Sequence, residues 1–212
     1  MKAKIKNIIF DLGVVLLDLN IDATVRAFER IGFSNFGDIY SQSKPTELFI
    51  KFDKGHITPD QFRNEVRAYI GSFLPGSIIE EAWNAMLGSI PADRMQLLQE
   101  LKSDFKLFLL SNTNETHITE FETILSNEFG ANAFQDCFEK IYYSCRAGMR
   151  KPDMDIYSLI IRENNLNPEE TIFIDDTLVH VEGARKAGLT AFHLQPQQSV
   201  EELLFEIFED QE

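Results

Sequence analysis

The residues best suited to chemistry are three aspartates that each follow a short apolar run. Asp11 comes directly after the apolar residues 8–10, and the pair Asp175-Asp176 comes directly after the apolar residues 172–174. An isolated carboxylate in an apolar setting costs several kcal/mol unless it is paired or binds a metal. A solvated strand end is the simplest explanation for any one of these aspartates. The rest of the chain has to decide between this explanation and a functional site.

Other polar side chains stand at similar places. Ser111 and Asn112 follow the apolar run 107–110, and the basic pair Arg150-Lys151 stands just before a predicted helix. Each of these features is common in loops and at helix starts. Together with the aspartates, however, they provide carboxylates, a hydroxyl and a cation that could act on a single ligand.

Three carboxylates at one place would repel one another unless a hard divalent cation held them. Oxygen ligands indicate Mg²⁺, which usually keeps several waters and also binds substrate phosphate. We therefore predict a site for a phosphoryl group. In this site Asp11 is the nucleophile, Ser111 donates a hydrogen bond to a phosphoryl oxygen, and Lys151 balances charge.

Such a site needs a scaffold that brings the ends of several strands together. From Asp93 onward, predicted helices alternate with short apolar strands. Short, fully apolar strands separated by helices are typical of a parallel sheet covered on both faces. Ligands of open α/β sheets bind beyond the carboxyl ends of the strands. The first predicted strand is the opening apolar run that leads to Asp11, and the others are 106–110, 141–143, 171–174 and 190–194. The predicted helices are near 95–101, 115–126, 153–163 and 181–188.

The segment between the first two strands has a helical pattern throughout. Residues 58–61 form a capping box with proline at the first helical position, and residues 77–80 repeat the capping pattern. We therefore predict an α/β fold with a Rossmann-like parallel-sheet core, made of residues 1–18 and 91–212. The all-helical insertion comprises residues 19–90.

The composition is that of an ordinary globular protein, with 212 residues, 44% hydrophobic and 25% charged. No stretch approaches the roughly 20 apolar residues of a membrane span, and Asp11 and Asp18 interrupt the first apolar run, unlike a secretory signal. A net charge of −14 disfavours nonspecific binding to nucleic acid or to an anionic membrane. Cys137 and Cys145 lack metal-site spacing, so we expect reduced thiols and a cytoplasmic location.

Four short motifs carry a family resemblance. They are FDLGVV at 10–15, LLSNTN at 109–114, GMRKPD at 148–153 and FIDDTLVHVEGARKAG at 173–188. In this order they resemble the motifs of the haloacid dehalogenase-like hydrolase superfamily, and the insertion stands where that family places its type 1 cap. The stretch DKGHITPDQF from Asp53 resembles the bacterial branch that includes the α-glucose-1-phosphate phosphatase.

The resemblance implies a Mg²⁺-dependent phosphatase that hydrolyses a small phosphorylated metabolite, such as a sugar phosphate, through an aspartyl-phosphate. Asp11 and Lys151 are then catalytic, and His56, in the loop of the cap, is as suited to touch substrate as to face solvent. His117, His180 and His193 show no partner spacing, and we assign them no role. The implied phosphate-binding residues are Ser111, Asn112, Lys151 and His56, and the implied metal ligands are Asp11, the Gly13 carbonyl, Asp176 and, through a water, Asp175.

Gly13 departs from the family pattern, in which phosphatases usually carry an acid–base aspartate at this position. Branches that read DLG resemble working phosphatases, so activity is still expected. A catalytically silent phosphate-binding protein is the alternative. A dehalogenase needs no metal, which the Asp175-Asp176 pair argues against, and a phosphomutase should depend more on the missing acid. The sequence predicts neither the particular substrate nor the oligomeric state.

Overall fold

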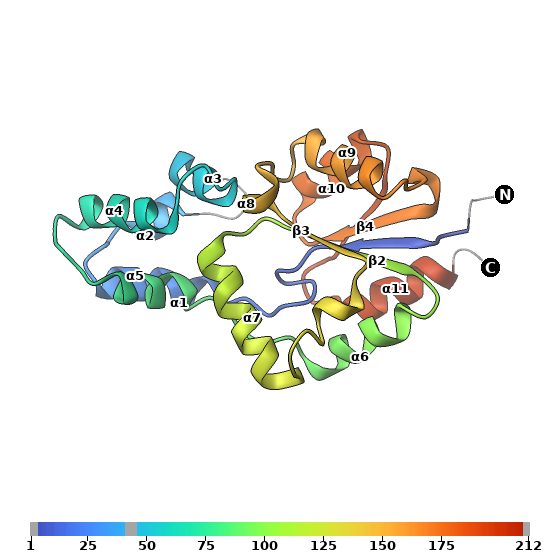
Figure 1. The fold of residues 1–212 in the computed structure, drawn as a ribbon, viewed down its shortest axis with the longest axis horizontal. Coiled ribbons are helices and arrows are strands. Elements are labelled where there is room, and N and C mark those ends of the chain that lie inside the picture. Colours follow the sequence, from blue (N-terminus) through green and yellow to red (C-terminus); the bar gives the residue numbers. More distant parts are fainter. Residues whose placement is uncertain (1–3, 41–45, 210–212) are drawn as a thin grey trace.

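The computed structural model describes residues 4–40 and 46–209, and its centre is a five-stranded sheet in which all neighbouring strands are parallel. The strand order is β3-β2-β1-β4-β5, with helices on both faces (Figure 1). The predicted α/β fold class with a Rossmann-like core is confirmed. The strands are β1 (Asn7–Phe10), β2 (Lys106–Ser111), β3 (Lys140–Tyr143), β4 (Thr171–Asp175) and β5 (Thr190–His193).

Each predicted strand boundary lies within one residue of the observed one, because the central strands are buried on both faces. Ile8 and Phe10 pack on one side of the sheet, and Ile9 packs on the other. The first side is covered by α6 (Ala92–Leu101), α7 (Glu115–Phe129) and α11 (Val200–Glu209), and the second by α9 (Met154–Glu163) and α10 (Leu178–Lys186).

The register of β1 places Asp11 between two other strand ends. Phe10 pairs with Leu109 of β2 and with Ile174 of β4. The Asp11 backbone N–H donates to the Ile174 carbonyl at 2.9 Å. The residues that follow these three strands therefore meet at one edge of the sheet, as the sequence predicts.

Among the described residues between Asn20 and Ala85, the regular elements are all helices, which pack around a core of their own and extend to one side of the sheet (Figure 1). This core is rich in stacked and edge-to-face aromatic rings, including Phe28, Phe36, Phe49, Phe62 and Trp83. The helices are α1 (Ile21–Arg30), α2 (Phe36–Ile39), α3 (Glu47–Asp53), α4 (Pro59–Ile70) and α5 (Gly76–Asn84).

Of the two predicted helix starts in the insertion, one is confirmed and one is wrong. Thr58 and Gln61 make both hydrogen bonds of a capping box at the start of α4. By contrast, α5 starts earlier than predicted, at Gly76, with Pro75 at the N-cap and no side-chain cap. Ser77 therefore lies inside the first turn, where its hydroxyl cannot act as the cap.

The two segments that join the insertion to the sheet pair with each other. Asp18 N–H donates to Ser89 at 3.0 Å, and Gly88 N–H donates to the Asp18 carbonyl at 2.9 Å. A Cβ on Gly88 would lie 2.7 Å from that carbonyl oxygen, so this close approach requires glycine. The Asp18 carboxylate accepts from Arg94 Nη1 at 2.9 Å. The insertion is thus attached through a paired two-stranded connection.

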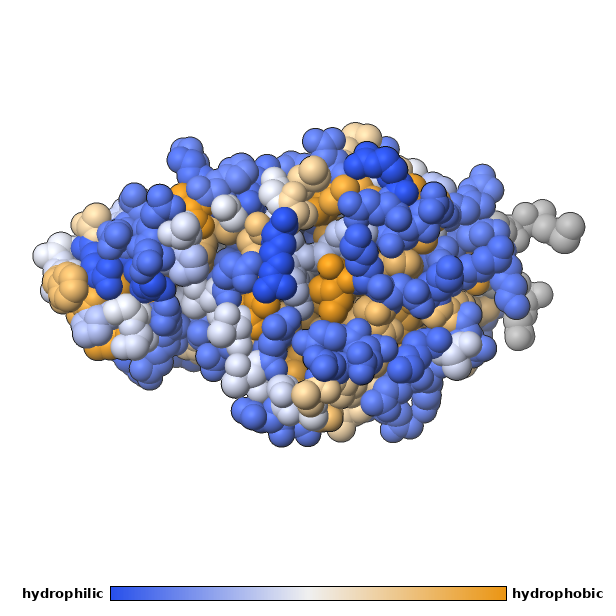
Figure 2. Space-filling model, in the orientation of Figure 1, coloured by the Kyte–Doolittle hydropathy of each residue, from blue (hydrophilic) through white to orange (hydrophobic). Residues whose placement is uncertain are grey.

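Polar residues cover most of the face in view, with apolar surface in small scattered patches (Figure 2). Within the described residues, no helix combines the length and the hydrophobicity that crossing a bilayer requires. Both cysteines are free thiols, as predicted. The remaining short helical segments are α8 (Ser144–Ala147) and the 3₁₀ turns Gln135–Cys137 and Pro168–Glu170.

Candidate active site

A cavity of about 90 Å³ lies at the carboxyl edge of the sheet, where the insertion meets the core. Asp175 lies behind this cavity and is fully buried. His56 is exposed and is not part of the lining, so the structure does not bring it to the site. The predicted site residues that line the cavity are Asp11, Gly13, Ser111, Asn112, Lys151 and Asp176.

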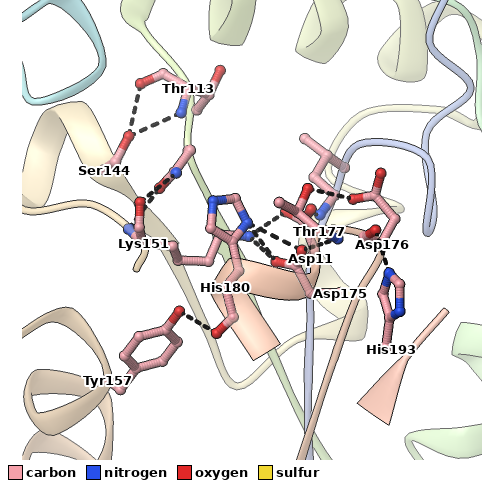
Figure 3. Close-up of polar contacts among 12 residues, drawn as sticks. Asp11, Thr113, Ser144, Lys151, Tyr157, Asp175, Asp176, Thr177, His180 and His193 are labelled. Atoms are coloured by element: carbon pink, nitrogen blue, oxygen red, sulfur yellow. Dashed lines mark hydrogen bonds and ion pairs between the residues drawn. The ribbon is translucent and has the colours of Figure 1, made fainter. Parts of the chain in front are cut away.

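The carboxylates of Asp11, Asp175 and Asp176 form a cluster at this edge, with one oxygen of each within 4.8 Å of the others (Figure 3). Burial raises the pKa of Asp11 well above its ordinary value, against the opposing effect of Lys151. Burial and the neighbouring Asp175 also raise the pKa of Asp176. The three carboxylates therefore have too little positive charge around them to balance their own. Their all-oxygen donor set fits Mg²⁺.

Lys151 is fully buried between two of these carboxylates. Its Nζ lies 2.7 Å from Asp11 Oδ1 and 2.6 Å from Asp175 Oδ2. Burial by itself would lower the pKa of Lys151, but the two carboxylates outweigh it and raise the pKa above its ordinary value. Lys151 therefore stays charged and holds the Asp11 side chain in place.

Asp175 is a counter-ion of the Lys151 ammonium. Its Oδ1 accepts from the Thr177 N–H at 2.8 Å and lies 3.1 Å from His180 Nδ1. Burial would raise the pKa of Asp175, but Lys151 and His180 outweigh burial and lower it. Because its oxygens already have these partners, Asp175 is less available than Asp176 as a direct metal ligand.

Ser111 is the last residue of β2 and Asn112 follows it, and the two side chains differ in how free they are to bind a ligand. Ser111 is buried and lines the cavity. The Asn112 side chain donates to the Lys151 carbonyl at 3.0 Å and accepts from the Lys151 N–H at 2.9 Å. This reciprocal pair orients the loop that carries Lys151. The Asn112 side chain is therefore engaged with the Lys151 backbone, and phosphate binding by this residue stays a prediction.

Gly13 offers a carbonyl, and a side chain at this position would require the Leu19 side chain to move. Its carbonyl accepts from the Val15 N–H at 2.7 Å, which leaves a second lone pair for a cation. A Cβ on Gly13 would lie 2.7 Å from Leu19 Cδ1. Leu19 thus occupies the space that an acid–base side chain at this position would need.

His117 joins the insertion to the core and was not assigned a role from sequence. Its ring stacks on Trp83 of α5 at 4.6 Å between centroids, and its Nε2 lies 3.1 Å from the Trp83 carbonyl. Burial lowers the pKa of His117 to about 4, so the ring is neutral near pH 7. Asn114 caps α7 and also accepts from Trp83 Nε1 at 3.3 Å. These contacts fix α5 against α7.

Several other cavity residues were not singled out as site residues. Asp53 stands three positions before His56, and His180 stands inside the fourth motif, but nothing in the local sequence marks either of them. Ser144 Oγ bridges the backbone of Thr113, at 2.9 and 3.0 Å, behind the cavity (Figure 3). The further lining residues include Tyr40, Asp53, Trp83, His117, Arg150 and His180.

With this fold and site, the chain belongs to the haloacid dehalogenase-like hydrolase family, whose sequence model matches residues 5–188. It is 27% identical over 190 residues to the D-ribitol-5-phosphate phosphatase of Bacteroides thetaiotaomicron, covering 89% of this chain and 91% of that protein. It is 30% identical over 194 residues to a sesquiterpene phosphatase of Aspergillus oryzae, covering 89% of each.

Solved structures show the same architecture. A family enzyme from B. thetaiotaomicron, in complex with magnesium and inorganic phosphate, superposes with a TM-score of 0.87 at 31% identity, over 94% of this chain and 98% of that one. L-2-haloacid dehalogenase from Xanthobacter autotrophicus has a TM-score of 0.62 at 20% identity, over 97% and 83%. The latter likeness concerns the fold alone.

Proposed function

We propose that this protein is a Mg²⁺-dependent phosphatase that hydrolyses a small phosphorylated metabolite. The observation that carries the proposal is the cluster of Asp11, Asp175 and Asp176 around the buried ammonium of Lys151. Relatives named as phosphatases, and a similar structure that holds magnesium and phosphate, support the same reaction class.

In the proposed reaction, the Asp11 carboxylate attacks phosphorus, and the bond from phosphorus to the leaving oxygen breaks. Water then hydrolyses the aspartyl-phosphate and releases inorganic phosphate. Ser111 donates a hydrogen bond to a phosphoryl oxygen, and Lys151 orients Asp11 and balances charge. Mg²⁺, held by Asp11, the Gly13 carbonyl and Asp176, with Asp175 acting through a water, would supply positive charge for carboxylates and phosphoryl group alike.

The proposal also assigns a role to each of the two parts of the chain. Residues 1–18 and 91–212 form the catalytic core, and the helical insertion of residues 19–90 is a cap that closes over the cavity. The alternative of a silent phosphate-binding protein would not require Asp11 and Lys151 to be held in contact at 2.7 Å. A dehalogenase would have no use for the acidic cluster.

The direct test is turnover of p-nitrophenyl phosphate by the purified protein, with and without Mg²⁺. We expect hydrolysis that requires Mg²⁺ and is lost on chelation. A protein that binds phosphate but releases none from this ester, with Mg²⁺ present, would establish the silent alternative instead.

Replacing Asp176 with asparagine should remove magnesium binding and activity together. Asp176 is the least buried member of the cluster and lines the cavity, so it is the member best placed to ligate an incoming cation. A ligand that binds only the folded state raises its stability, so Mg²⁺ should raise the melting temperature of the wild type but not of Asp176→Asn. Asp155→Asn removes an exposed aspartate from α9 and serves as the matched control. Unchanged magnesium stabilisation in Asp176→Asn would contradict the assignment.

The glycine at position 13 predicts a preference among leaving groups. General acid help is worth roughly 10²- to 10⁴-fold, and its absence should matter least where the leaving oxygen is intrinsically acidic. We therefore propose that glucose 1-phosphate is a better substrate than glucose 6-phosphate. The relative named for ribitol 5-phosphate acts on a primary alkyl ester, so this preference rests on the leaving-group argument alone.

The comparison is kcat/KM for the two glucose phosphates in the wild type and in Gly13→Asp. Because Leu19 fills the space next to Gly13, the double variant Gly13→Asp/Leu19→Ala is measured as well. It should reduce the preference for glucose 1-phosphate over glucose 6-phosphate. A wild type that prefers the 6-phosphate would end the argument.

A further inference from the structure

A second polar cluster lines the cavity on the side of the insertion. Arg150 directly precedes Lys151 but does not join the acidic cluster, and only 8% of its surface is exposed. Among the described residues, its Nε has no hydrogen-bond partner. Its Nη2 lies 3.6 Å from Asp53 Oδ2, beyond direct hydrogen-bond distance. A buried N–H without a partner is destabilising, so the Arg150 guanidinium has unused donor capacity that a ligand can satisfy.

Asp53 and Tyr40 add further hydrogen-bonding groups to the same side of the cavity. Asp53 is the last residue of α3, and burial raises its pKa to about 6 despite Arg150. At 3.6 Å, Arg150 does not make a close hydrogen bond to this carboxylate, which keeps acceptor capacity. The Tyr40 hydroxyl lies 3.8 Å from Met86 Sδ, and a thioether sulfur is a weak acceptor. The cluster thus combines a cationic donor, an anionic acceptor and a hydroxyl.

This combination fits neutral hydroxyl groups better than a second charged group. The charges of Arg150 and Asp53 offset each other, so an additional phosphate or carboxylate would be attracted by one and repelled by the other. A hydroxyl group can accept from the Arg150 guanidinium and donate to Asp53 at the same time. Apolar residues of the same cavity, including Trp83 and Leu87, can cover a carbon skeleton.

We propose that Asp53, Arg150 and Tyr40 form a subsite for the hydroxyl groups of the substrate, which selects polyhydroxylated phosphate monoesters over apolar ones. This inference rests on the proposed phosphatase function. It names the class of substrate and the residues that discriminate.

A simple ion pair that tethers the insertion to the core is the competing explanation. The chain already has such a tether next to the subsite, because Lys54 Nζ of the insertion lies 2.7 Å from Asp153 Oδ2 of the core. Neither Lys54 nor Asp153 lines the cavity. Lys54→Gln is therefore a matched control, since it breaks a contact between insertion and core without changing the subsite.

The experiment measures kcat/KM for three substrates in four proteins. Ribitol 5-phosphate and n-pentyl phosphate share chain length and a primary ester but differ in hydroxyl groups, and p-nitrophenyl phosphate reports the chemistry alone. The proteins are the wild type, Arg150→Met, Tyr40→Phe and Lys54→Gln.

We expect the wild type to prefer ribitol 5-phosphate to pentyl phosphate by at least about 10-fold. Arg150→Met should lower kcat/KM for ribitol 5-phosphate by roughly 10- to 100-fold, as for a lost hydrogen bond to a charged group, and change the other two substrates by less than about 3-fold. Tyr40→Phe, which keeps all charges and should fold in any case, should reduce the same preference by roughly 3- to 10-fold. Lys54→Gln should leave it unchanged.

The subsite is refuted if the wild type shows no preference, or if the subsite variants lower all three substrates alike, as loss of a tether would. A wild type that fails to hydrolyse p-nitrophenyl phosphate would instead remove the proposed phosphatase function, and the subsite assignment with it. The two failures are therefore distinguishable.

Discussion

Replacing Asp11 with asparagine is expected to lower kcat to background, a loss of roughly 10⁴-fold or more, because an amide cannot form the covalent phosphoryl intermediate. The variant should still fold. Asparagine keeps the shape of the side chain and removes one of three crowded carboxylates. It should also still bind inorganic phosphate, measured as a rise in melting temperature.

The pH dependence of stability provides a second readout for this variant. The pKa of Asp11 is raised on folding, so the folded protein binds this proton more tightly than the unfolded chain does. In metal-free wild type, the stability that this proton contributes is lost as pH rises above the ordinary value of 3.8. Asp11→Asn should lack this loss and should be at least as stable as the wild type near pH 7.

Asp18→Asn is the matched control for Asp11→Asn. It removes a carboxylate from the same loop, but that carboxylate binds Arg94 at 2.9 Å and does not line the cavity. We expect activity within a few-fold of the wild type. If Asp11→Asn turned over substrate at the wild-type rate, the nucleophile would have to be another residue.

Replacing Lys151 with methionine should cost both activity and stability. The ammonium is fully buried and contacts Asp11 and Asp175, and removal of one partner of a buried ion pair typically costs about 3–5 kcal/mol. We expect a loss of this size near pH 7 in urea unfolding, with kcat reduced by roughly 10³-fold or more because Asp11 and the phosphoryl group lose their cation. The exposed pair of Lys6 and Glu170 provides the control, and Lys6→Gln should cost at most about 1 kcal/mol.

The contribution of Asp175 to the pH dependence of stability should change sign in this variant. In the wild type, the lowered pKa of Asp175 contributes stability that is present above 3.8 and is lost as pH falls through the folded-state pKa. Without Lys151, burial should raise that pKa, so Lys151→Met should become more stable as pH falls. The double variant Lys151→Met/Asp175→Asn should recover part of the stability and none of the activity. A Lys151→Met protein with wild-type stability and turnover would contradict this account.

The sheet and the residues at its edge could be predicted because their signals are local. A parallel strand buried on both faces is a continuous apolar run, so β1, β2 and β4 are visible in the sequence together with the polar residue that ends each. Strand ends of a parallel sheet share one edge. That rule is sufficient to bring Asp11, Ser111 and Asp176 to one cavity.

The residues contributed by the insertion could not be predicted, because their position depends on how its helices pack against the core. Asp53 ends α3, and His56 lies in the loop that follows this helix. The packing of α3 directs Asp53 into the cavity and leaves His56 exposed. Arg150 is adjacent to Lys151 in the sequence. Only the tertiary structure shows that the two side chains lie on different sides of the cavity. Similarly, the partnership of Asn112 with the Lys151 backbone spans 39 positions of sequence.

The most direct test of the central claim, covalent catalysis by Asp11, is acid-quenched mass spectrometry during turnover with Mg²⁺ and p-nitrophenyl phosphate. Protein quenched in the steady state and digested should carry one acid-stable, base-labile phosphoryl group on the peptide that contains Asp11, and Asp11→Asn should carry none. Active turnover with no phosphoryl group on that peptide at any quench time, or with the group on a different residue, would contradict the account.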